Sequence, residues 1–157
     1  MTVTDDVIEG EVLPAVVQAA PVTLFRSDDP AEVLRRATET ADILAAAVKD
    51  RGLVKRIGGK DFPLVEAWTM LGTLVGVFPV PAWTRQIEGG WHARVEARTR
   101  DGAVVGAAEA IVTRSESNWR NRDEYALLSM AQTRATGKAL RLPLGFIMTL
   151  AGYEATP

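Results

Sequence analysis

The chain has 157 residues, 47% hydrophobic and 24% charged, with a formal net charge of −2, which is ordinary for one soluble globular domain. The absence of cysteine excludes disulfides, thiolate nucleophiles and cysteine-ligated zinc, and the single histidine, His92, excludes histidine metal clusters. The acidic start lacks the basic region of a secretory signal, and the longest apolar run is too short for a bilayer. We therefore expect a cytoplasmic protein that does not enter a membrane and needs no cofactor.

Charge is distributed unevenly along the chain. Residues 1–26 hold four carboxylates and one arginine, a net charge of −3, whereas residues 85–141 hold ten basic and seven acidic side chains, a net charge of +3. Because residues 1–26 lack helical periodicity and contain Pro14 and Pro21, we predict a flexible acidic arm ahead of a core domain over residues 27–157. A mildly basic body fits a polyanionic partner, and a solvated surface of mixed charge is the alternative.

The first predicted helix starts in "SDDPAEVLRR", where Asp28 or Asp29 is the N-cap and Pro30 takes the first helical position. Gly52 provides its C-terminal stop. Its predicted apolar stripe comprises Val33, Ala37, Thr40, Ile43 or Leu44, and Ala47 or Val48. A short hairpin follows, in which "LVKRI" and "KDFPLV" flank a turn at Gly58–Gly59.

A second, short helix is predicted from Val65 or the next residue to Leu74, ended by Gly76 and the Pro79/Pro81 pair. The segment "PAWTRQI" then adds a strand to the meander that follows.

The clearest structural signal is a hairpin in which "WHARVEARTR" and "AVVGAAEAIVTR" flank Asp101–Gly102, a two-residue turn. That turn places Arg100 opposite Ala103 and Arg94 opposite Glu109. One face is then small and apolar, so that a helix can lie close to it. Its members are Trp91, Ala93, Val95, Ala97, Val104, Gly106, Ala108, Ala110 and Val112.

A polar loop, "SESNWRNRD", leads into a long helix with Asp123 as its N-cap. The predicted inner face of this helix comprises Leu128, Ala131, Ala135, Ala139 and Leu142. The order of elements predicts an α+β fold: an antiparallel β-meander packed against a long helix, with an N-terminal helix and a second short helix.

The long helix also carries Arg134, Lys138 and Arg141, at spacings of four and three that align them on one face. The meander followed by a helix ending in "GKALR", a small turn and a hydrophobic segment resembles the DNA-binding core of the Rad-fifty-two-like single-strand annealing superfamily, with its phage and actinobacterial Erf- and Sak-related proteins. The resemblance covers roughly residues 50–155. It rests on "VEAWTMLGTLVGVFP", "GWHARVEARTRDGAVVGAAEA" and "RDEYALLSMAQTRATGKALRLPLGFIMTLAGYE", in that order.

The resemblance implies a protein of DNA recombination and repair that forms a ring or filament, works without ATP, and holds single-stranded DNA by its phosphates in a basic groove. By motif match, Lys138 and Arg141 contact the phosphates; periodicity adds Arg134. Gly137 stands where relatives often carry another cation. Many relatives continue into a tail that recruits a single-strand-binding protein or a recombinase, and we expect that tail to be missing here. A solvated helix edge is the alternative for the three cations.

Two further groups are candidates for DNA contact. In the loop, Trp119 can stack on bases while Arg120 and Arg122 pair with phosphates; alternatively, Trp119 anchors the loop on the core and the arginines pair with neighbouring carboxylates. In "VKRIGGK", Lys55 and Arg56 can line the groove, or they are plain surface charge. An arginine outside the row, Arg114, is expected to contribute little.

Three other assignments remain open. The outer hairpin face, with Arg94, Arg98 and Arg100, is either an outer DNA path or a neutralised subunit interface. A structural homo-oligomer that binds no DNA would use the same strand edges for assembly. A metal-dependent nuclease would need Glu96 and Glu109 as a carboxylate pair, although the predicted register does not set them opposite each other. We expect no enzymatic activity.

Overall fold

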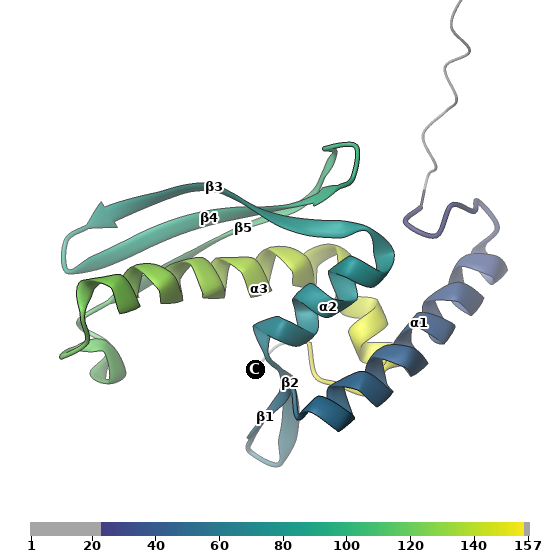
Figure 1. The fold of residues 1–157 in the computed structure, drawn as a ribbon, viewed down its shortest axis with the longest axis horizontal. Helices are drawn as coiled ribbons and strands as arrows, with labels where there is room; N and C mark the ends of the chain where they lie inside the picture. The colour runs from purple at the N-terminus through teal and green to yellow at the C-terminus, as the bar shows by residue number, and fades with distance from the viewer. Residues whose placement is uncertain (1–22, 156–157) are drawn as a thin grey trace, which may run out of the picture.

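A computed structural model describes residues 23–155 of the chain. The elements in chain order are α1 (Pro30–Arg51), β1 (Val54–Ile57), β2 (Lys60–Pro63), α2 (Val65–Val75), β3 (Val77–Ile87), β4 (Gly90–Thr99), β5 (Val104–Thr113), the short 3-10 helix η1 (Ser117–Trp119) and α3 (Glu124–Leu150). The predicted α+β fold is confirmed: α3 packs along one face of the antiparallel sheet β3-β4-β5, and α1, α2 and the β1–β2 hairpin gather around its C-terminal end (Figure 1).

The predicted N-terminal arm falls mostly on residues 1–22, outside the described residues. Its last residues, 23–26, form a turn, and two of them, Leu24 and Phe25, pack in part against the core.

Helix α1 has the predicted ends. The Asp29 side chain accepts a hydrogen bond from the Ala31 N–H at 3.1 Å, and Gly52 closes the helix with φ +64°, a left-handed conformation that glycine adopts without strain. The predicted stripe needs a correction, because Ala41 is buried in place of Thr40 and Ile43 is 63% exposed. The buried stripe is Ala37, Ala41, Leu44 and Val48.

The strand predicted from Pro81 begins four residues earlier, and the two prolines do not end α2. Pro79 and Pro81 do not separate α2 from the sheet; they lie within β3, which begins at Val77. An edge strand tolerates proline because one side of its backbone has no ladder partner, and the register shifts between Pro81 and Trp83. The short helix itself was predicted correctly, since α2 ends at Gly76.

The predicted β4–β5 register is confirmed over most of the hairpin, where Arg94 lies opposite Glu109. The two-residue turn was wrong. Arg98 pairs with Val104, and the Thr99 N–H donates to the Ala103 carbonyl at 2.9 Å, so the connection is a wider loop preceded by a β-bulge. A bulge reverses the direction of the side chains beyond it, and Val104 is consequently 52% exposed instead of facing the helix.

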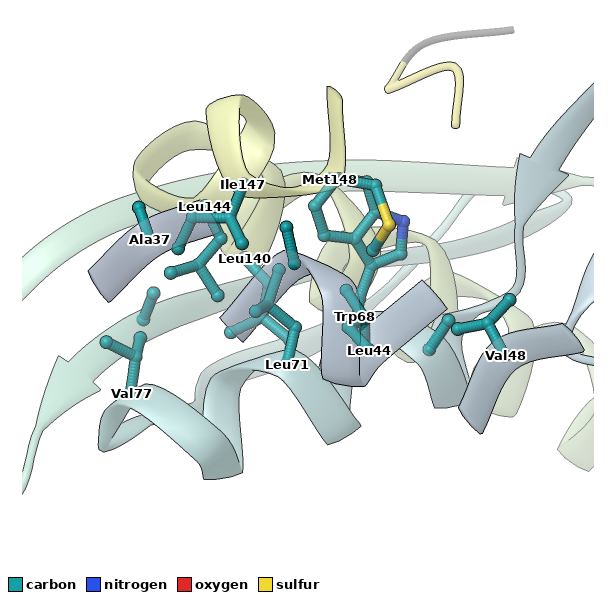
Figure 2. Packing of buried hydrophobic residues seen from close by; sticks show 13 residues of the cluster. Ala37, Leu44, Val48, Trp68, Leu71, Val77, Leu140, Leu144, Ile147 and Met148 are labelled. Carbon is teal, nitrogen blue, oxygen red and sulfur yellow. The ribbon is translucent and has the colours of Figure 1, made fainter. Parts of the chain in front are cut away.

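The buried residues form two clusters. The sheet core lies between the sheet and the first half of α3, and comprises Ala93, Val95, Ala110, Val112, Leu127, Ala131, Ala135 and Ala139. The helical core lies among α1, α2 and the second half of α3, and comprises Ala37, Ala41, Leu44, Val48, Ala67, Trp68, Leu71, Val77, Ala97, Leu140, Leu144, Ile147 and Met148 (Figure 2).

Helix α3 runs without interruption through Pro143 to Leu150, so the predicted end of the helix after "GKALR" was wrong. Two predicted inner residues also need correction: Leu127 is buried in place of Leu128, and Leu142 is 65% exposed. Leu142 is exposed because α3 changes its buried face after Ala139. Its buried positions recur every four residues up to Ala139 and then continue from the next residue, about 100° further round the helix.

Candidate nucleic-acid interface

The first predicted contact residue, Arg134, lies at the edge of the sheet. Its guanidinium donates to both carboxylate oxygens of Glu116, at 2.9 and 2.7 Å, and to the main-chain carbonyl of Ile111 at 3.2 Å. The hydrogen bonds from Arg134 lower the pKa of Glu116. Arg134 therefore covers part of the β5 edge and is engaged by protein groups.

Lys138 and Arg141 follow on the same flank of α3, four and seven residues further along. Lys138 is exposed, whereas Arg141 is half-buried and donates to the Ala155 carbonyl at 3.2 Å. Because Arg134 on this flank reaches Ile111, the row runs beside the free edge of β5.

The loop before α3 is held by a residue that the sequence interpretation set aside. Arg114 donates to the main-chain carbonyls of Arg120 and Arg122, at 3.3 and 2.7 Å, and to the carboxylate of Glu124 at 2.8 Å. Glu124 also accepts from the Trp91 indole N–H at 2.7 Å. Hydrogen bonds, first from Arg114 and then from Trp91, lower the pKa of Glu124.

No sequence spacing pointed to this role of Arg114, because its side-chain partners are two main-chain carbonyls of the loop and one carboxylate at the start of α3. The one available signal was its position directly after β5, where the chain turns into the loop. Because Arg114 holds the loop backbone, Arg114→Ala would disturb the loop and is no neutral control for the removal of a phosphate-binding cation.

The loop's aromatic residue faces inward. Trp119 is half-buried against the sheet core, and the Arg134 guanidinium carbon lies 6.0 Å from its ring centroid. Of the two roles predicted for Trp119, this position matches the one in which its side chain anchors the loop on the core. Arg120 and Arg122 are exposed and form no ion pair with residues 23–155, since the neighbouring Glu124 is engaged by Arg114.

Lys55 and Arg56 lie on the exposed β1–β2 hairpin. Arg56 approaches Asp61 at 3.8 Å and donates to the Gly59 carbonyl at 3.3 Å. Glu154 connects this hairpin to the end of α3, because its carboxylate pairs with the Lys60 ammonium at 3.1 Å. The C-terminal residues 154–155 thus contact both the hairpin and Arg141. The structure places the hairpin cations near the C-terminal end of α3, away from the Trp119 loop at its N-terminal end (Figure 1).

The outer face of the sheet, by contrast, is neutralised. Glu109 accepts from Arg94 at 3.2 Å and contacts the His92 imidazole at 2.9 Å, while Glu96 accepts from Arg98 at 2.6 Å. The two carboxylates of the nuclease alternative are therefore engaged by arginines. Within residues 23–155, no cluster of three or more histidine, aspartate or glutamate side chains is placed to hold a metal ion.

The sequence interpretation missed one feature of this face. The Arg85 guanidinium carbon lies 4.3 Å from the centroid of the Trp83 ring, and Trp83 meets the His92 imidazole edge-on at 4.8 Å. The residues two apart on β3 share a face, which was the available signal. Arg85 thus covers the aromatic ring that this face would offer for stacking.

The chain matches no protein-family model and shows no significant similarity to a curated protein or to a solved structure.

In the described part of the chain, no helix combines the length and the apolar character needed to cross a bilayer.

Proposed function

We propose that this protein binds single-stranded DNA through the α3 flank and anneals complementary strands as a cytoplasmic homo-oligomer, without ATP. The proposal joins the resemblance stated above to the α+β arrangement of a meander on a long helix. The phosphate contacts are assigned to Lys138 and Arg141, with Arg120 and Arg122 extending the path at the N-terminal end of α3.

One observation carries the assignment: the cations of the two candidate surfaces differ in their partners. Arg94 and Arg98 on the outer sheet face are paired with carboxylates, whereas Lys138 and Arg120 are exposed and form no ion pair with any residue from 23 to 155. A phosphate can bind an unpaired cation without displacing a carboxylate. The α3 flank is therefore the better polyanion site.

The dimensions of the row suit backbone contact. The seven-residue interval from Arg134 to Arg141 spans about 10 Å along the helix, at 1.5 Å per residue. Cations along such a path hold phosphates without reading the sequence, which leaves the bases free to pair. Arg134 contributes less to this path than its spacing suggested, because Glu116 holds it.

Assembly is the second part of the proposal. Among the described residues the sheet has two edge strands without a further ladder partner, β3 and β5. Strand β5 contains neither proline nor a basic residue, and Arg134 occupies one carbonyl of its edge, that of Ile111. A free edge of this length is a template for a strand of a second copy, and the resemblance implies a ring or filament. A scaffold that assembles through these edges without binding DNA is the competing function.

The decisive experiment measures single-stranded DNA binding against salt for Lys138→Ala with Arg141→Ala. We expect the double variant to lose most binding, and the slope of log affinity against log salt to fall by about one for each phosphate contact removed. The matched control is Lys49→Ala with Arg51→Ala, which removes the same two charges from exposed positions at the end of α1.

Equal binding by the two double variants would reject the α3 flank as the site. Light scattering in the same titration separates binding from assembly: a mass of one 17.0 kDa chain, with and without DNA, would reject the oligomer. A large complex that never binds DNA would favour the scaffold.

A further inference from the structure

A large open hollow lies outside the cationic row. It is bounded by α1, the junction of α2 and β3, the tip of the β4–β5 hairpin and the C-terminal third of α3, and it measures about 1600 Å³. Pockets for small ligands usually measure about 300–1,000 Å³ and enclose most of the ligand. The size and openness of this hollow fit a segment of polypeptide better than a metabolite.

The hollow exposes large apolar side chains from five different elements. They are Ile43, Leu74, Phe78, Val105 and Phe146, whose exposed fractions range from 37% to 63%. Single exposed apolar residues are common on protein surfaces, but a contiguous group of this kind marks a surface that another element covers.

The charge around this apolar surface is positive. Four arginines line the hollow against two carboxylates, Glu39 and Asp101. The Asp101 carboxylate accepts a hydrogen bond from the Thr99 hydroxyl, and the Glu39 carboxylate forms an ion pair with Arg35. Arg26 and Arg100 form no ion pair within residues 23–155. The ligand that complements this lining combines apolar side chains with carboxylates.

The chain itself leads into the hollow. Thr23, Leu24, Phe25 and Arg26 are part of its lining. The turn they form is fastened to α1, because the Arg36 guanidinium donates to the Phe25 carbonyl at 2.7 Å. The polypeptide that precedes Thr23 is therefore attached at the hollow's own wall.

We propose that residues 5–17 of the same chain dock in this hollow. The segment reads "DDVIEGEVLPAVV": it carries four carboxylates and no basic side chain, interleaved with apolar residues that include Ile8 and Leu13. Its composition complements the lining, with apolar side chains for Phe78 and Phe146 and carboxylates for Arg26 and Arg100. Only residues 18–22 separate it from the wall, so a tether this short gives an effective concentration in the millimolar range. The proposal concerns a surface apart from the α3 flank and does not depend on DNA binding.

Disulfide trapping in the full-length chain tests this docking, because the chain has no cysteine of its own. Leu13→Cys is combined with Thr73→Cys, which lies on the hollow's lining, or with Thr38→Cys, which does not. The two threonines are matched: each is exposed on a helix and donates to the carbonyl four residues earlier, at 3.0 and 2.8 Å. Thr38 is also nearer to Leu13 along the chain, so random contact favours the control.

We expect the Thr73 pair to form an intrachain disulfide at least about ten-fold faster than the Thr38 pair, because docking raises the local thiol concentration. Neutralising the segment with Asp6→Asn and Glu9→Gln is expected to slow the Thr73 pair and leave the Thr38 pair unchanged. Equal rates for the two pairs would overturn the proposal. A disulfide-linked dimer in place of the intrachain product would overturn it too, by assigning the hollow to the segment of a second copy.

Discussion

The two halves of α3 pack against their neighbours with side chains of different sizes. The first half faces the sheet with alanines at 131, 135 and 139, whereas the second half faces α1 and α2 with Leu144, Ile147 and Met148. Small residues let a helix approach the backbone of a sheet, while large residues fill the wider space between helices. Figure 2 shows the second arrangement, in which Leu44, Leu71 and Leu144 from three helices belong to one buried cluster with Trp68.

The difference explains where the cations are. Because the first half lies close to the sheet, a side chain on its flank, Arg134, reaches the Ile111 carbonyl on the strand edge. In the second half, where the buried face has turned away from the sheet, Arg141 instead donates to the main-chain carbonyl of Ala155. Lys138 lies between the two and is exposed.

The largest expected effect comes from the helical core. Leu144→Ala removes a fully buried side chain and leaves a cavity among three helices, which typically costs about 2–5 kcal/mol of unfolding free energy. Leu142→Ala makes the same change two residues away at a position that is 65% exposed, and is expected to stay within about 0.5 kcal/mol of the parent. Urea unfolding of both variants checks the difference. Similar losses would mean that α3 does not change its buried face.

A medium effect is expected where the middle of α3 lies against β5. A Cβ atom on Gly106 would lie 2.9 Å from the Ala139 carbonyl oxygen and 2.9 Å from Pro143 Cδ. Gly106→Ala therefore forces the helix and strand apart and is expected to cost about 1–3 kcal/mol.

The control for this change is a glycine on α3 itself, whereas Gly106 lies on β5. Gly137 has no atom within 4 Å of the corresponding position, so Gly137→Ala is expected to stabilise the helix by up to about 1 kcal/mol. Thermal unfolding of both variants shows whether Gly106→Ala lowers the stability while Gly137→Ala raises it. A neutral Gly106→Ala would show that the sheet core is loosely packed.

The smallest expected effect is on the pH dependence of stability. Arg134 lowers the pKa of Glu116 in the folded state, so this pair stabilises the fold above the unfolded pKa of glutamate, about 4.3, and the contribution is lost as the pH falls through the lowered folded value. Glu116→Gln should therefore be less stable than the parent at neutral pH, by at most about 1 kcal/mol for so exposed a pair, and equal to it in strong acid.

Unfolding measured from pH 7 to pH 2 checks this, with Glu66→Gln, the same change at an exposed position, as the control. A Glu116→Gln variant whose stability runs parallel to the parent over the whole range would mean that Arg134 does not depend on Glu116.

The local features of this protein were determined by the sequence alone. Asp29, Pro30 and Gly52 set the ends of α1, because caps and special dihedral angles act within a few residues. The turn predicted at Asp101–Gly102 gave the β4–β5 register, including Arg94 opposite Glu109, although the connection itself is wider than two residues. Periodicity also placed Arg134, Lys138 and Arg141 on one flank of a helix.

The tertiary structure decided what those features contact. A one-residue bulge turned Val104 outward, and sequence periodicity cannot reveal such a shift because it assumes an unbroken register. The sequence predicted that the helix ends with "GKALR", just before Pro143. In the structure the helix continues through Pro143, because packing in the helical core outweighs the local preference of proline. Likewise, the sequence predicts only that Arg134 and Arg114 are cations at the surface. In the folded chain Arg134 meets the Glu116 carboxylate and Arg114 meets the loop carbonyls, and no rule of sequence spacing predicts either contact.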